Sequence, residues 1–245
     1  MTDLKTKVVL NVPVQALSMT ETLGFIKSRI DDNQFTQHVV VNAGKIVAMQ
    51  HDEALRQSVL EADMINADGM SVVWASRFLG KALPARVAGI DLMLELVKMA
   101  HEHGYKCYFL GARQEVVEKV VDTFSKEYSS SIIAGYRNGY FKEEEEQIAK
   151  DISSSGADML FVAMSSPKKE IFVNKYKQLM NVPFVMGVGG SFDVVAGVTK
   201  RAPLWMQNVG LEWFYRFIQE PRRMWKRYLV GNSKFLWLVL KARLK

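Results

Sequence analysis

Hydrophobic and polar positions follow two different periods along this chain, and the two periods predict alternating strands and helices. Short β-branched, aliphatic and aromatic runs, typical of buried strands, occur at 38–41, 106–110, 131–134, 159–164 and 183–188. Apolar residues spaced by three and four positions predict helices at 18–30, 52–61, 92–103, 115–126 and 167–180. This alternation predicts an α/β fold with a Rossmann-like, mostly parallel sheet flanked by helices.

Individual residues sharpen several of these boundaries. Every second residue of 8–12 is apolar, which predicts a first strand that ends at Pro13. Ser18 and Glu21 have the spacing of a capping box, so a helix should begin there. Gly104 follows the helical run 92–103, where a glycine typically ends a helix.

The end of the chain differs from the rest in charge and in aromatic content. From residue 200 onward there are eleven Lys or Arg and two acidic residues, whereas the whole chain has a net charge of +6. Four of the five tryptophans lie there as well: Trp205, Trp213, Trp225 and Trp237. We therefore expect residues 1–198 to form the α/β domain and residues 199–245 a basic, aromatic-rich helical appendage.

Within this appendage the sequence predicts two helices, 203–219 and 221–230. The second places the apolar side chains of Met224, Trp225, Tyr228 and Leu229 beside four basic residues. An anionic membrane surface would attract such a helix, and so would a nucleic acid. A helix pair that packs on the core with a solvated basic face is the alternative. The apolar run 235–240 is consistent with shallow insertion into a membrane.

Overall composition narrows the class of protein. With 245 residues, 49% of them hydrophobic, the chain can build one large core. The single cysteine, Cys107, lies in an apolar run, so we expect a buried, inert thiol and no internal disulfide. Residues 1–7 are polar and charged, and no apolar run approaches the roughly 18 residues that span a bilayer. These features predict a cytoplasmic protein.

A single acidic residue lies where a predicted strand gives way to a helix. Asp68, in the segment Asn66-Ala67-Asp68-Gly69, follows an apolar stretch and precedes the helix-like run 70–79. A carboxylate in such a loop could act as a general base. The alternative is an aspartate that caps the following helix, because Asp readily accepts free backbone N–H groups.

Two further residues occupy similar positions. Asn42 ends the buried run 38–41, and the carboxyl ends of parallel strands face the ligand crevice of an open α/β sheet. It could therefore contact a ligand, or simply cap the next helix. Arg86 precedes a glycine-containing loop and a helix start, a suitable place to hold a phosphate. A solvated loop arginine is the alternative.

Common cofactor and metal motifs do not fit. Gly187-Val188-Gly189-Gly190 resembles the start of a dinucleotide fingerprint, but Phe192 stands in place of the third glycine. No phosphate-binding loop of the Gly-Lys-Ser/Thr type occurs, and His101 and His103 cannot share one helix face. We therefore expect chemistry without a cofactor and without a metal.

Taken together, several segments resemble the WecG/TagA/CpsF family of bacterial glycosyltransferases. The resemblance covers nearly the whole chain and rests on these segments: Asn42, Asn66-Ala67-Asp68-Gly69, Arg86-Val87-Ala88-Gly89-Ile90-Asp91, Ser166-Pro167-Lys168-Lys169-Glu170, Gly189-Gly190-Ser191-Phe192-Asp193, Lys200-Arg201-Ala202-Pro203, Gly210-Leu211-Glu212-Trp213, Arg216 and Glu220-Pro221-Arg222-Arg223.

The resemblance implies an inverting, metal-independent enzyme that moves a hexose or N-acetylmannosamine from a UDP-sugar to a polyprenyl-diphosphate-linked saccharide for cell-surface polysaccharides. Asp68 matches the proposed general base. The implied donor site comprises Asn42, Arg86, Gly111, Lys169 and Glu170. Lys169 stands where many relatives have Gln, and Val40 where some have Thr, and both departures bear on which sugar is transferred.

For the appendage, the resemblance implies closure over the active site. Arg216, Arg223 and Lys226 match positions that offer basic groups to the acceptor diphosphate. The protein would then act peripherally on the inner face of the cell membrane, on an anionic surface and without a nucleic-acid partner. A homo-oligomer is compatible with the sequence.

Two other classes of function compete with this interpretation. One is a non-enzymatic module that binds nucleic acid or membrane through the basic end of the chain. Its affinity for any duplex would fall steeply with salt. The other is a dinucleotide-dependent oxidoreductase, against which the incomplete glycine pattern argues.

Overall fold

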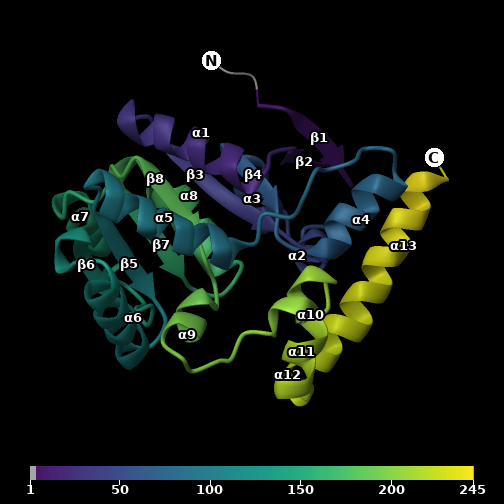
Figure 1. Cartoon of the computed structure of the whole chain (residues 1–245). Helices are drawn as coiled ribbons and strands as arrows, with labels where there is room; N and C mark the ends of the chain where they lie inside the picture. Colours follow the sequence, from purple (N-terminus) through teal and green to yellow (C-terminus); the bar gives the residue numbers. More distant parts are fainter. Residues whose placement is uncertain (1–3, 245) are drawn as a thin grey trace.

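The computed structural model describes residues 4–244, except for the side chains of Asn208, Arg223, Lys226 and Arg227. At its centre is a six-stranded sheet in the order β4-β3-β8-β7-β5-β6, with every neighbouring pair parallel (Figure 1). The strands are β3 (Thr36–Val41), β4 (Met64–Ala67), β5 (Cys107–Gly111), β6 (Ile133–Arg137), β7 (Met159–Ala163) and β8 (Phe184–Gly187). The predicted α/β fold is confirmed.

Helices cover both faces of the sheet, which is why most of its strands are apolar along their whole length. One face is covered by α1 (Met19–Asp31), α5 (Gly89–His103), α6 (Gln114–Glu127) and the short α9 (Ser191–Val195). The other face carries α2 (Ala43–Ala48), α3 (Glu53–Leu60), α7 (Glu145–Ser154) and α8 (Lys168–Met180). A 3₁₀ turn (Ser130–Ile132) leads into β6. Cys107 is buried in β5, as predicted, and burial raises the pKa of its thiol.

The start of the chain forms a hairpin, so the prediction of one strand ending at Pro13 was wrong. β1 (Thr6–Val9) pairs antiparallel with β2 (Val12–Gln15), and Pro13 lies inside β2. Leu10 and Asn11 both adopt positive φ, 50° and 64°, as the tightest hairpin turns require.

This hairpin protects one edge of the main sheet. β4 is an edge strand, and its exposed backbone would otherwise be open to pairing. The side-chain oxygen of Gln15 accepts a hydrogen bond from the backbone N–H of Ile65 in β4. The hairpin therefore satisfies a backbone donor of the strand that leads to Asp68.

The end of the chain is helical, as predicted, but one predicted helix is broken. Residues 203–219 form α10 (Leu204–Asn208) and α11 (Glu212–Gln219), separated at Gly210, which has a φ of 75°. A Cβ at Gly210 would lie 2.9 Å from the Cβ of Met70 in α4 (Met70–Phe78), so the break lets the chain pack closely against α4. α12 (Pro221–Trp225), a π-helical turn (Lys226–Val230) and α13 (Gly231–Arg243) follow.

The last helix packs against the α/β domain beside α2 and α4 (Figure 1). Phe235 and Val239 are buried, 3% and 6% exposed, in the same apolar cluster as Val14 and Ile46. The expectation that the whole run 235–240 inserts shallowly into a membrane was therefore wrong for these two residues. Among the described residues, no helix is both long and apolar enough to cross a bilayer.

Candidate active site

The Asp68 loop opens at the carboxyl edge of the sheet, where a ligand crevice is expected. The backbone N–H of Asp68 donates to the carbonyl oxygen of Val41, at 2.9 Å, so the ends of β3 and β4 lie together. One carboxylate oxygen of Asp68 accepts the N–H of Gly89, the first residue of α5, at 2.8 Å. Asp68 thus bonds to the start of α5 and not to α4, the helix that it would cap in the alternative interpretation. Its side chain is partly exposed.

Asn42 and Arg86 lie beside this loop. A Cβ on Gly69 would be 3.4 Å from the Cβ of Asn42, which places the two loops in contact. The Asn42 side chain accepts the backbone N–H of Lys45 at 3.0 Å and so caps α2, as one of the two alternatives held. The backbone N–H of Val87, the residue after Arg86, donates to the carbonyl oxygen of Ala67 at the end of β4. This bond places Arg86 beside the loop. The structure therefore gathers Asn42, Asp68 and Arg86 at one edge.

The side chain of Arg86 is largely buried and is paired with an acidic residue. Its guanidinium donates to Glu212 of α11 at 3.1 Å. The other carboxylate oxygen of Glu212 lies 3.5 Å from Nε of Arg201, and Arg201 forms a two-pronged pair with Asp91, at 2.5 and 2.8 Å. We call these four residues, Asp91, Arg201, Glu212 and Arg86, the clasp. Arg201, Glu212 and Asp91 were not among the predicted site residues.

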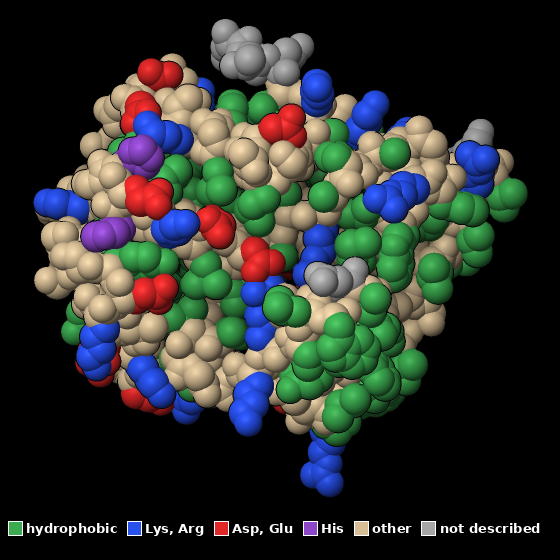
Figure 2. Space-filling view, in the orientation of Figure 1, with side chains coloured by type: hydrophobic (Ala, Val, Ile, Leu, Met, Phe, Trp, Pro, Cys, Tyr) green, Lys and Arg blue, Asp and Glu red, His purple; other side chains and the backbone are tan. Residues whose placement is uncertain are grey.

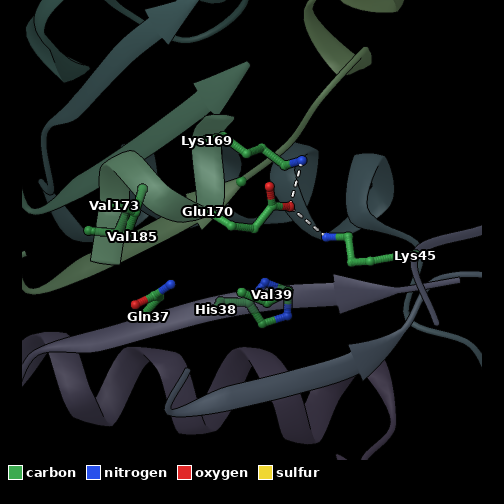
Figure 3. A pocket seen from close by; sticks show the side chains of 9 residues that line it. Gln37, His38, Val39, Lys45, Lys169, Glu170, Val173 and Val185 are labelled. Carbon is green, nitrogen blue, oxygen red and sulfur yellow. Dashed lines mark hydrogen bonds and ion pairs between the residues drawn. The ribbon is translucent and has the colours of Figure 1, made fainter. Parts of the chain in front are cut away.

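A second group of charged residues lies at the starts of α2 and α8. Lys45 and Lys169 both contact the same oxygen of Glu170, at 2.8 and 2.7 Å (Figure 3). All three side chains are at most 10% exposed. The predicted residues Lys169 and Glu170 come from the first turn of α8, whereas Lys45, which no sequence pattern indicated, comes from α2. Because Asn42 caps α2, the α2 first turn connects this group to the Asp68 loop.

Glu170 is ionised in this setting. Burial alone would raise the pKa of its carboxyl group, but the attraction of Lys45 and Lys169 outweighs burial and lowers the pKa to about 2. The group borders a small cavity beneath the carboxyl edge, also lined by Gln37, Val39 and Gly187 (Figure 3). Asp68 is not among the residues that line this cavity.

A buried polar pair supports β4 just before the loop. Nε2 of His38 and the side-chain oxygen of Asn66 lie 2.9 Å apart, and both residues are fully buried. Burial lowers the pKa of His38 to about 4, although the bond to Asn66 opposes this shift. The imidazole is therefore neutral at pH 7, and the pair ties β3 to β4 two residues before Asp68.

Gly111 lies at the same edge of the sheet but in a different strand. β5 is four places from β4 in the sheet order, roughly 19 Å at the usual strand spacing. Gly111 has a φ of 128°, and a Cβ there would lie 2.4 Å from the carbonyl oxygen of Ala163. Close contact with β7 thus accounts for this glycine, and a donor contact there stays a prediction.

Of the three basic residues expected at the acceptor diphosphate, the structure places one. Arg216 lies one helical turn after Glu212, on the face of α11 that meets the clasp. The side chains of Arg223 and Lys226 lie outside the described part of the structure. Among the described residues, no three of His, Cys, Asp and Glu are grouped to hold a metal ion.

Comparison with known proteins decides the family. The glycosyl transferase WecG/TagA/CpsF family matches residues 7–245. This chain belongs to that family. Its strands, loops and appendage are thus those of a WecG/TagA/CpsF glycosyltransferase.

Two relatives of this glycosyltransferase are N-acetylglucosaminyldiphosphoundecaprenol N-acetyl-beta-D-mannosaminyltransferases. The one from Bacillus subtilis (strain 168) is 34% identical over 239 residues, covering 97% of this chain and 92% of the relative. The one from Bacillus spizizenii (strain ATCC 23059 / NRRL B-14472 / W23) is 39% identical over 180 residues, covering 74% and 69%.

Family membership also decides between the classes of function. A WecG/TagA/CpsF protein is a glycosyltransferase, so the alternatives of a non-enzymatic binding module and of an oxidoreductase are wrong. The family resemblance seen in the sequence is confirmed. The role of each site residue remains a prediction.

Proposed function

We propose that this glycosyltransferase moves N-acetylmannosamine from a UDP-linked donor to an N-acetylglucosaminyl diphospho-lipid, with inversion and without a metal ion. The names of the two relatives support the sugar and the acceptor, since one relative aligns along 97% of this chain. The observation that carries the mechanism is the grouping of Asp68, Asn42 and Arg86 at the carboxyl edge of the sheet.

In this proposal Asp68 is the general base. An acceptor hydroxyl is a poor nucleophile, and a carboxylate that removes its proton as the glycosidic bond forms contributes roughly 10²–10⁴-fold. The hydrogen bond from Gly89 to one oxygen of Asp68 fixes the direction of the carboxylate. Direct displacement with a single base inverts the configuration at the transferred carbon.

Fixed cations would take the place of a metal at the departing diphosphate. Arg86 lies beside the base, and Lys45 and Lys169 lie at the start of α2 and α8, where helix N–H groups also favour anions. Charged donors held in place before the reaction stabilise developing negative charge without reorganising. Together these groups would stabilise the negative charge that develops on the departing nucleotide diphosphate.

The appendage would bring the enzyme to its lipid substrate. Figure 2 shows apolar side chains gathered on the surface of α10–α12 and along α13. The exposed side chains include Leu204, Trp205, Ile218, Leu229, Leu236 and Trp237, each between 59% and 74% exposed. An apolar patch of this kind next to basic residues is typical of a membrane-binding surface. We therefore place the enzyme peripherally on the inner membrane face, with Arg216 near the acceptor diphosphate.

The decisive experiment replaces the base. Purified protein is incubated with UDP-N-acetylmannosamine, an N-acetylglucosaminyl diphospho-lipid and a chelator, and UDP release is measured. Asp68→Asn keeps an oxygen for the Gly89 N–H but cannot take a proton, so we expect a loss of roughly 10²–10⁴-fold. Asp52→Asn is the matched control, because Asn caps α3 as well as the native Asp52 does. Equal turnover in Asp68→Asn and Asp52→Asn would remove Asp68 from the mechanism.

A further inference from the structure

The clasp is the one ionic connection between the start of the appendage and the Asp68 loop among the described residues. It uses residues from three places: the segment before α5 and its first turn, the linker after α9, and the first turn of α11. Its side chains are between 18% and 37% exposed, so the ions are only partly hydrated. Two arginines face two carboxylates, and the charges within the clasp balance.

Glu212 is the central member of this group. One of its oxygens accepts from Arg86, and the other faces Arg201, so each oxygen is directed at a different guanidinium. Arg201 is held in turn by its two-pronged pair with Asp91. Paired guanidinium and carboxylate forks fix geometry as well as charge. Glu212, which accepts the hydrogen bond from Arg86, is thus linked to α5 through Arg201 by an ion contact of 3.5 Å, in which Nε of Arg201 makes no hydrogen bond.

The same end of α5 also holds the candidate base. Gly89 donates to Asp68, and Asp91, two residues later, anchors Arg201. A single helix start thus fixes the carboxylate of Asp68 directly and the guanidinium of Arg86 through Arg201 and Glu212. The backbone of Arg86 is held by the bond from Val87 to Ala67, and its guanidinium is held by Glu212 of α11.

We propose that Glu212 is a positioning residue for Arg86, held in place by Arg201 and Asp91, and that it presents the guanidinium to the diphosphate of the nucleotide-sugar donor. This inference rests on the proposed function, in which Arg86 binds that diphosphate. A long arginine side chain loses rotamer freedom when it binds a ligand, and a partner that orders it beforehand reduces this cost. The opposing effect is the negative charge of Glu212, which by itself would repel a phosphate. The two effects predict opposite signs for the same substitution.

The experiment measures UDP binding to the full chain by calorimetry. Glu212→Gln removes the charge and weakens the hold on Arg86, so we expect UDP to bind about tenfold more weakly, the scale of one charge-assisted hydrogen bond. In an Arg86→Ala background the same Glu212→Gln change should have no further effect, because its target is gone. The matched control is Glu53→Gln, which breaks an equally long 3.1 Å pair with Arg56 on the surface of α3.

A second variant keeps the test usable if Glu212→Gln does not fold, which melting curves will show. Arg201→Lys preserves the charge but not the fork to Asp91. It should weaken UDP binding about threefold, less than Glu212→Gln, because it acts one step further from Arg86. Combined with Arg86→Ala, it too should change nothing.

Each other outcome has a distinct meaning. Tighter binding of UDP to Glu212→Gln would make Glu212 a competing counterion and overturn the positioning role. An equal loss with and without Arg86 would show general support of the fold, and it would overturn the role as well. Inorganic diphosphate is the second probe. If wild type binds neither UDP nor diphosphate, the proposed donor site itself fails, whereas binding of both that is unchanged in Glu212→Gln contradicts the clasp alone.

Discussion

Glu170 is a single carboxylate placed between two buried ammonium groups. Its side chain is 2% exposed, and those of Lys45 and Lys169 are 9% and 10% exposed. Removing ions from water is costly, and their mutual attraction offsets that cost only while the partners stay together. The burial of each of these three charged side chains therefore depends on the other two.

Replacing this carboxylate should be among the most damaging substitutions in the chain. Glu170→Gln leaves two buried ammonium groups without a counterion, and we expect a loss of about 3–5 kcal/mol in the free energy of unfolding. Urea denaturation at pH 7 measures it. Glu146→Gln is the control, because it breaks a pair with Lys150 of the same 2.7 Å length on the surface. Comparable losses in the two variants would contradict the burial argument.

The pKa of Glu170 also determines the pH range over which acid destabilises this group of residues. The pKa is about 2 in the folded chain and 4.5 as the ordinary value, so the folded state holds the carboxylate ionised more strongly. The contribution to stability is fully present above pH 4.5 and is lost as the pH falls through about 2. The stability difference between wild type and Glu170→Gln should therefore shrink over that interval.

At this scale the sequence predicted single residues better than their partners. Asp68 and Asn42 were singled out because local patterns place them at strand ends, and Lys169 and Glu170 because the family resemblance implies them. Glu212 was not, because its contact with Arg86 spans 126 positions of the chain and no local pattern specifies it. Lys45 was missed for the same reason, since its partner Glu170 lies 125 positions away.

Secondary-structure elements were predicted where their periodicity is long and their ends carry a chemical signal. The helix that starts at the capping box of Ser18 and Glu21 is an example, and the structure shows both of its reciprocal bonds. The hairpin was missed because Leu10 and Asn11 are not the glycine-rich pair typical of its turn. The break at Gly210 was missed because close packing on Met70, and not the helical pattern, decides it.

α13 shows how one helix can serve two purposes. Its residues Phe235 and Val239 complete a core cluster, while Leu236, Trp237 and Leu240 on the other side are more than half exposed. Helical spacing separates the two sets, because positions four apart share a face. An apolar run of six residues therefore cannot be assigned to core or to surface as a block.

The two faces of α13 can be separated by a pair of neighbouring substitutions. Phe235→Ala removes a fully packed ring, and we expect it to lower the free energy of unfolding by about 3–5 kcal/mol. Leu236→Ala removes a side chain that is 62% exposed and should leave stability close to wild type. Chemical denaturation of both variants measures the difference. If Leu236→Ala were the more destabilised, α13 would have to turn its opposite face to the core.

On the scale of the whole molecule, the excess of positive charge and most of the exposed large apolar side chains lie in residues 199–245. The α/β domain contains the sheet and the candidate base, and the appendage contains most of the exposed tryptophans. Figure 2 shows apolar side chains gathered on the appendage. The sequence composition predicted this asymmetry. The division into residues 1–198 and 199–245 remains a proposal, since α13 shares a core cluster with the α/β domain.

This asymmetry predicts how the full chain meets a lipid surface. We expect it to sediment with vesicles containing anionic lipid more than with neutral ones, and to be released as salt rises, because basic residues supply part of the attraction. Replacing Leu204 and Trp205 with Ala should reduce sedimentation on both kinds of vesicle. Tyr140→Ala is the control, since Tyr140 is 77% exposed but follows β6, at the opposite edge of the sheet. Equal sedimentation of all three proteins would refute the membrane surface.

The cluster that joins Val9, Val12 and Val14 to Phe235 and Val239 links the first hairpin to the last helix. During translation the hairpin, β3, β4 and α2 all emerge before α13, so the part of this cluster that Phe235 and Val239 cover stays exposed to water until α13 has been made. A chain interrupted before α13 would therefore leave part of this apolar cluster open to chaperones and proteases. The packing that stabilises the finished enzyme would thus also make chains that lack α13 more susceptible to degradation.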